Sequence, residues 1–183
     1  MKQNGHGQAK LLTNEEFTEI LETAELKFGL KYKVIFGIAY YTGCRMSECL
    51  QLRWSDICST HITFRNQTTK TKKTRQVPIS SKLKVLLDSF KVSGDRCDDY
   101  LFPGRTKHLT IKVVDKNLKW ICDYCDFKGI STHSFRRSAM TNMYRNGVPL
   151  TAIQEFTGHK DFNELRKYLE HDENAVVNAV ELL

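Results

Sequence analysis

The sequence lacks the features that are typical of membrane and secreted proteins. Its longest apolar stretch, residues 34–41, is far too short to span a bilayer and is interrupted by Gly37. Residues 1–7 contain no apolar segment like that of a secretory signal peptide. We therefore expect a cytoplasmic protein that makes no contact with a membrane.

Patterns that indicate a metal site are equally scarce. Of the six cysteines, Cys122 and Cys125 have the spacing of half a zinc site, but no second pair with finger-like spacing is present. Disulfides are typical of secreted proteins, for which the sequence gives no sign. The sequence predicts free thiols, no bound metal and no cofactor.

What the chain has in excess is positive charge. Its 183 residues include 28 Lys and Arg against 21 Asp and Glu, which gives a formal net charge of +7. The length suits a single domain, and the 40% of apolar residues are enough to form one core. A nucleic acid is the first partner to expect, because a basic protein attracts a polyanion.

The pattern of apolar residues indicates an α+β protein that is mainly α-helical. Thr13 and Glu16 have the spacing of a capping box, and Gly43 is a suitable helix C-cap. Apolar residues at helical spacing predict helices over 17–28, 31–42, 48–52 and 83–90, and most of the chain after residue 104 is also predicted to be helical. Residues 61–64 and 76–79 are short and β-rich, which predicts a hairpin of a small antiparallel sheet.

Arg45 is the first residue that breaks a local rule, because it lies between two apolar helices. A cation in that position needs a charged partner or a bound anion. Glu48, three residues further on, is placed to orient it. A salt-bridged connector and an anion-binding arginine both fit this segment.

The predicted hairpin carries a run of basic residues with no acidic residue from Arg65 to Arg75. Such a run is commonly a solvated loop, but a hairpin could also present it to DNA phosphates. We predict DNA contacts for four of its residues and for one arginine elsewhere: Arg65, Lys72, Lys73, Arg75 and Arg137.

His133 and Arg136 lie three residues apart at the start of a predicted helix that is capped by Ser131 or Thr132. The face that they share continues through apolar residues, so Arg136 is expected to point toward the core. An arginine there fits a buried anion site, or it pins backbone carbonyl groups. Further on, His159 follows Gly158, and Tyr168 by itself would be read as a core aromatic residue.

Together these residues form an inventory for phosphoryl transfer without metal. Arginine binds phosphate oxygens through a planar fork and stays charged. A tyrosine can attack phosphorus if a base or a strong positive field assists it, and a histidine can take its proton. No paired carboxylates that could hold magnesium accompany them.

At this point the sequence resembles the catalytic domain of a tyrosine recombinase, of the phage-integrase family. The segment 41–57 resembles the box of the family's first arginine, and His133-Ser134-Phe135-Arg136 resembles its His-x-x-Arg box. Residues 147–159 are similar to the stretch that ends at the family's second histidine, His159, and Tyr168 lies nine residues further on, where the nucleophile is usual. Lys70 lies eight residues before Pro78, the family's position for the catalytic lysine.

The resemblance implies a site-specific recombinase or integrase, as found in mobile elements, that acts on double-stranded DNA without metal or ATP. Tyr168 would form a 3′-phosphotyrosyl link, Arg45, Arg136 and His159 would stabilise the transition state, and His133 would be the base. Lys70 would be the general acid, although nearby Lys72 or Lys73 could take that role. A type IB topoisomerase-like enzyme and a non-catalytic DNA-binding relative are the alternatives.

The resemblance also bears on domains and assembly. Residues 1–183 are expected to be a catalytic domain alone, without the core-binding domain that usually precedes it. The apolar stripe in residues 172–183 would either pack on its own core or pass to a neighbour in a tetramer on DNA, the free protein being a monomer. A prokaryotic or viral origin and use at the nucleoid are expected.

Overall fold

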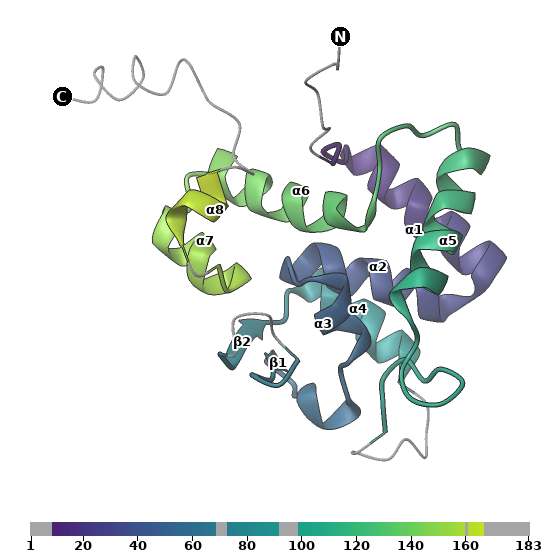
Figure 1. The fold of residues 1–183 in the computed structure, drawn as a ribbon, viewed down its shortest axis with the longest axis horizontal. Helices are drawn as coiled ribbons and strands as arrows, with labels where there is room; N and C mark the ends of the chain where they lie inside the picture. The colour runs from purple at the N-terminus through teal and green to yellow at the C-terminus, as the bar shows by residue number, and fades with distance from the viewer. Residues whose placement is uncertain (1–8, 69–72, 92–98, 160, 167–183) are drawn as a thin grey trace, which may run out of the picture.

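The computed structural model describes residues 9–68, 73–91, 99–159 and 161–166. In these ranges the helices are α1 (Asn14–Phe28), α2 (Leu30–Thr42), α3 (Met46–Leu50), the 3₁₀ turn η1 (Trp54–Asp56), α4 (Ser81–Phe90), α5 (Ile111–Tyr124), α6 (Thr132–Arg145), α7 (Leu150–Thr157) and α8 (Phe162–Arg166). Two strands, β1 (His61–Phe64) and β2 (Arg75–Pro78), complete the elements. The prediction of a mainly helical α+β fold with a small antiparallel sheet is confirmed (Figure 1).

Helix α2 is the centre of the core. It packs against α1, α4 and α6, and its residues from Val34 to Ala39 are almost completely buried. The rings of Phe36 in α2 and Phe135 in α6 stack with their centroids 5.1 Å apart. None of the helices in the described ranges has both the length and the apolar character that a membrane span requires.

The ends of the first two helices form as their sequence predicts. The Thr13 side chain accepts from the Glu16 backbone N–H, and the Glu16 carboxylate accepts from that of Thr13. Gly43 ends α2 in the left-handed region, with φ of 56°. A Cβ on Gly43 would lie 2.9 Å from the Phe156 ring, so glycine is needed both for the turn and for this close approach. The turn leads directly into Arg45.

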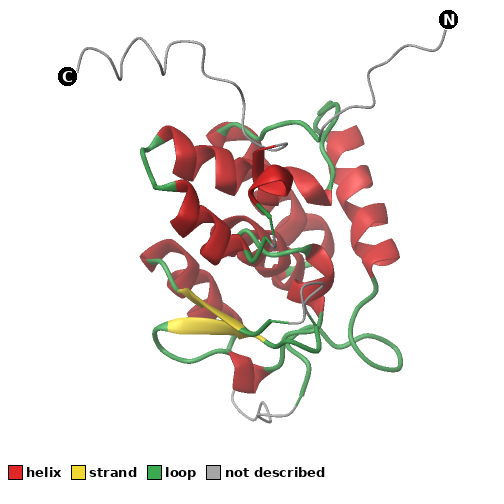
Figure 2. Ribbon diagram, turned by 60° about the vertical axis from the view of Figure 1, so that its left-hand side comes forward, coloured by secondary structure: helices red, strands yellow, loops and turns green. Residues whose placement is uncertain are grey.

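The hairpin also forms as predicted. Strands β1 and β2 are antiparallel, with His61 opposite Pro78 and Phe64 opposite Arg75. Figure 2 shows this ribbon at one end of the helical body. The hairpin tip, residues 69–72, lies outside the described residues.

Helices α6, α7 and α8 form a second, smaller cluster around Met140, Ile153 and Leu165. Helix α6 leads from the side of α2 to this cluster, and α7 then turns back toward the hairpin (Figure 1). The start of α6, the end of α7, the turn after α2 and strand β2 consequently meet at one place.

Candidate active site

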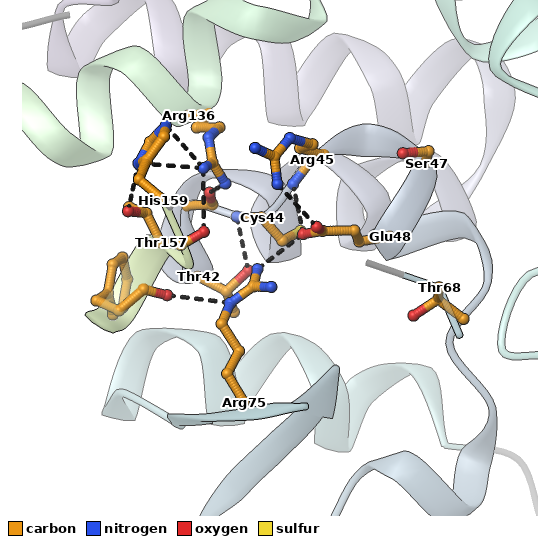
Figure 3. Close-up of polar contacts among 12 residues, drawn as sticks. Thr42, Cys44, Arg45, Ser47, Glu48, Thr68, Arg75, Arg136, Thr157 and His159 are labelled. Carbon is orange, nitrogen blue, oxygen red and sulfur yellow. Dashed lines mark hydrogen bonds and ion pairs between the residues drawn. The ribbon is translucent and has the colours of Figure 1, made fainter. Parts of the chain in front are cut away.

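Arg136 is the centre of the polar cluster at this meeting place (Figure 3). It is only 4% exposed, as its position on the apolar stripe of α6 predicts. Its Nη1 donates to the Gly43 carbonyl at 2.6 Å and its Nη2 to the Thr157 carbonyl at 3.0 Å. Arg136 thus connects the ends of α2 and α7. Of the two roles that the sequence allows for this arginine, an anion site and the binding of backbone carbonyl groups, the structure shows the second.

His159 lies against the same guanidinium. Arg136 Nη2 is 3.0 Å from His159 Nε2, and Thr157 Oγ1 is 2.7 Å from Nδ1. Because a guanidinium only donates, Nε2 must accept, which assigns the proton to Nδ1. Thr157 Oγ1 donates to the Ile153 carbonyl and is therefore free to accept that proton. Burial, followed by the charges of Arg136 and Arg45, lowers the pKa of His159 to about 3, which agrees with a neutral ring.

Arg45 is oriented by Glu48, as the sequence predicts. The Arg45 backbone N–H donates to Glu48 Oε2 and its Nη1 donates to Oε1, each at 3.1 Å. The side chain of Arg45 is 19% exposed, whereas that of Glu48 is completely buried. The buried Glu48 carboxylate therefore fixes the orientation of the partly exposed Arg45 side chain at the edge of the site.

Arg75 is a second arginine that binds the Glu48 carboxylate, in addition to Arg45. Arg75 Nη2 donates to Glu48 Oε2 at 2.7 Å. Burial by itself would raise the pKa of Glu48, but the charge and hydrogen bond of Arg75, the Arg45 backbone N–H and the charge of Arg136 together outweigh it, so the pKa lies below its ordinary value. Glu48 is thus a carboxylate surrounded by arginines, and the cluster has an excess of positive charge.

A cleft of about 790 Å³ opens beside this cluster and is lined in part by Arg45, His133 and Arg136. His133 is exposed in the first turn of α6, as predicted. Burial and then the charge of Arg45 lower the pKa of Arg136 to about 10, so it stays protonated at neutral pH. Two guanidinium groups that repel each other beside an open cleft favour the binding of an anion.

Several of the predicted site residues lie outside the described residues. They are Lys70, Lys72, Tyr168 and the segment 172–183. Their roles stay predictions. The described residues contain no group of three or more His, Cys, Asp or Glu side chains that could hold a metal ion, and the described cysteines, which do not include Cys97, are free thiols.

The residues expected to contact DNA differ in exposure and in bonding partners. Lys73 is exposed. Arg65 forms an ion pair with Asp56 and donates to Ser55 Oγ at 2.8 Å. Arg137 is 9% exposed and donates to the Ala9 carbonyl at 2.6 Å, which ties α6 to the segment before α1. DNA contacts by these residues remain predictions.

Sequence reasoning did not single out the inward role of Arg75 or the role of Thr157. The sequence places Arg75 in the basic run, where a DNA contact is expected, but only 8% of its side chain is exposed. The signal was present in the strand period, because residues two apart share a face and Val77 is buried. For Thr157 the position directly before Gly158 and His159 offered no comparable signal.

The neutral state of His159 predicts how stability depends on pH. The unfolded chain binds a proton at His159 near the ordinary pKa of 6.5, whereas the folded protein does so only near 3. Between these two pKa values the unfolded state therefore binds more protons than the folded state, and the free energy of unfolding falls as the pH is lowered from one value toward the other. We expect a loss of more than about 1.4 kcal/mol, the value of one pKa unit.

Denaturant titrations at several pH values between 6.5 and 4.5 measure this effect. The upper limit of this pH range is the ordinary pKa of His159. The lower limit is the ordinary pKa of Glu48, and in the folded protein the pKa of Glu48 lies below that value and therefore below the range. The His159→Gln variant should show a flatter profile in this window. An equally steep profile in that variant would contradict the prediction.

Comparison with known proteins shows which proteins the chain resembles. The family model described as "Phage integrase family" matches residues 10–175. A protein named tyrosine recombinase, from Thermosipho africanus, is 27% identical over 173 residues, which cover 94% of this chain and 61% of the relative.

Solved structures agree on the fold. A crystal structure of XerA recombinase matches with a TM-score of 0.78 at 21% identity, over 96% of this chain and 65% of that chain. A structure of XerH site-specific recombinase bound to its difH substrate, a pre-cleavage complex, matches with a TM-score of 0.72 at 24% identity, over 93% of this chain and 53% of that chain. The chain thus spans between half and two thirds of the length of these proteins.

Proposed function

The chain belongs to the phage integrase family, and from this premise we propose that it cuts and rejoins DNA strands by transesterification through a 3′-phosphotyrosyl intermediate. The observation that supports the proposal most is the cluster of Arg45 and Arg136 with His159, held by buried protein groups beside an open cleft. Preorganised donors of this kind stabilise charge that develops on phosphate oxygens.

Each residue has a proposed role in the reaction. The Tyr168 oxygen attacks the scissile phosphorus while the bond to the 5′ oxygen breaks. His133 takes the tyrosine proton, and Lys70 gives a proton to the leaving 5′ oxygen. Arg45 and Arg136 donate to the non-bridging oxygens, and His159 joins them once the phosphate displaces its bond to Arg136 and the ring carries its proton on Nε2. The 5′-hydroxyl of a partner strand then attacks the phosphotyrosyl bond and releases Tyr168, so the energy of the broken bond is conserved and no ATP is consumed.

We propose double-stranded DNA as the partner, because the cleft is cationic and the exposed Lys73 extends the positive charge along the hairpin. Exchange between two duplexes requires four cleavages, so a homotetramer on DNA is the proposed assembly, with residues 172–183 as the segment exchanged between protomers. We place the protein in the cytoplasm, where chromosomal or mobile-element DNA of a prokaryote is accessible.

The test is a covalent adduct with DNA. The protein is incubated with a pool of nicked, fluorescently labelled duplexes that carry a randomised central segment, with EDTA present and without ATP. We expect a protein–DNA band that survives SDS, and sequencing of the captured DNA would identify the preferred site. No SDS-resistant band with any duplex in the pool would contradict the proposal.

A supercoiled plasmid that carries two copies of the captured site separates a recombinase from a topoisomerase. A recombinase excises or inverts the segment between the sites. A type IB topoisomerase relaxes plasmids that lack the sites equally well. The names of the relatives favour the first outcome.

The general acid is tested separately. Lys70→Ala is expected to slow cleavage by about 10²- to 10⁴-fold, the usual contribution of a general acid. A substrate with a 5′-bridging phosphorothiolate should restore the rate, since a sulfur leaving group needs no proton. Lys72→Ala and Lys73→Ala are the matched controls. Rescue confined to one of these controls would move the acid role from Lys70 to that lysine.

A further inference from the structure

Arg75 differs from Arg65 and Lys73, the other described basic residues of the run, because it points into the protein. Its side chain is 8% exposed, whereas Lys73, Thr74 and Gln76 around it on the chain are exposed. A buried guanidinium is costly unless its environment pairs it. Its Nη1 is fully buried and has no hydrogen-bond partner among the described residues. The bonds of its other nitrogens must therefore hold the side chain in this position.

The guanidinium of Arg75 joins three separate segments. Nη2 donates to Glu48 Oε2 in α3 at 2.7 Å, and Nε donates to the Phe156 carbonyl near the end of α7 at 3.2 Å. The group also lies over the ring of Phe64 in β1, 4.5 Å from its centroid. Figure 3 shows Arg75 rising from β2 toward Glu48. The hairpin is thereby fixed to the segment that follows Arg45 and to the segment that precedes His159.

Through Glu48, Arg75 reaches Arg45. Glu48 Oε2 accepts from both Arg75 Nη2 and the Arg45 backbone N–H, while Oε1 accepts from Arg45 Nη1. Because the carboxylate is completely buried, water is not available to replace a lost donor. Loss of Arg75 would leave Glu48 free to turn, and Arg45 would lose its fixed orientation.

Arg75 also supports the turn that carries His159. Gly158 ends α7 in the left-handed region with φ of 69°. A Cβ on Gly158 would lie between 3.2 and 3.4 Å from Arg75 side-chain atoms, so the guanidinium packs directly against this turn. The next residue is His159, whose ring meets Arg136.

We propose that Arg75 is a positioning residue for strand cleavage: it fixes Glu48, and thereby Arg45, while it supports the turn of His159. This inference rests on the proposed function. Arg75 acts through these residues and does not itself touch the phosphate. It should consequently affect the rate of cleavage at saturating DNA more than the affinity for DNA.

The test compares Arg75→Lys and Arg75→Met with Lys84→Met. Lys84 is an exposed cation on α4 whose ion pair with Asp88 lies outside the catalytic cluster, so its removal controls for the loss of one positive charge. The rate of adduct formation is measured under single-turnover conditions at saturating nicked duplex, using a sequence captured from the randomised pool. Affinity is measured by fluorescence anisotropy, and folding by circular dichroism.

Both Arg75 variants should cleave about tenfold to hundredfold more slowly, the range expected for losing a hydrogen bond to a charged group. Their affinity should change no more than that of Lys84→Met. Lysine keeps the charge opposite Glu48 but cannot reproduce the fork that reaches Phe156 as well. If Arg75→Met does not fold, Arg75→Lys carries the comparison.

A double-mutant cycle tests the route through Glu48. In a Glu48→Gln background, Arg75→Lys should lose most of its effect, because the two residues act in series. Effects that multiply independently would overturn the route through Glu48 to Arg45, and a wild-type rate in Arg75→Lys would overturn the inference as a whole. Absence of an adduct with the wild-type protein would remove the proposed function together with the inference, so the two failures are distinguishable.

Discussion

Replacing Tyr168 with phenylalanine is expected to abolish the covalent protein–DNA adduct. The substitution removes only the oxygen that would attack phosphorus and leaves the aromatic ring in place. The rate should fall by about a millionfold, as in another enzyme that lost its catalytic nucleophile, which places it below detection. Binding of the intact duplex, measured by fluorescence anisotropy, should stay close to that of the wild type.

Tyr124→Phe is the matched control for this loss. Tyr124 is 61% exposed on α5, where its ring stacks on Trp120, so removing its hydroxyl should leave the adduct unchanged. A normal yield of adduct from Tyr168→Phe would show that another group is the nucleophile.

The second large effect is expected at Arg136. In Arg136→Lys the charge is retained, but one ammonium cannot bond to the Gly43 and Thr157 carbonyls and to His159 as the guanidinium does. We expect cleavage to slow by about 10³-fold, the scale of removing a preorganised donor from a transition state. The free energy of unfolding should also fall by about 1–3 kcal/mol, because a buried carbonyl loses its donor.

Two measurements separate these contributions. The adduct rate is determined at a temperature where circular dichroism shows the variant to be folded. Arg105→Lys, at an exposed position before α5, is the control for an arginine-to-lysine change and should behave as the wild type. A folded Arg136→Lys protein that cleaves at the wild-type rate would contradict the proposed role of Arg136.

Local signals in the sequence were sufficient for most of the fold. The capping box of Thr13 and Glu16 and the C-cap at Gly43 depend on residues only a few positions apart, and both form as predicted. The same holds for Arg136, whose place on the apolar stripe of α6 predicts its burial. Chemistry that is set within one helix or one turn can be inferred from spacing alone.

The arrangement around Glu48 could not be inferred in that way. The strand period places Arg75 on the same face as the buried Val77, but the groups that it meets there depend on how β2 lies against α3 and α7. Arg75 bonds to groups that are 27 and 81 positions away in the chain. Arg137 shows the same limit, because its partner, the Ala9 carbonyl, is 128 positions away. Contacts of this range are fixed by tertiary packing.

The most direct test of the proposed function is to identify the residue that becomes linked to DNA. Wild-type protein is trapped on the captured nicked duplex, the DNA is digested with nuclease, and the peptides are mapped by mass spectrometry. We predict a nucleotide attached through a 3′-phosphodiester to the oxygen of Tyr168 and to no other residue. A nucleotide on a different side chain, or no modified peptide at all, would contradict phosphotyrosyl chemistry at Tyr168.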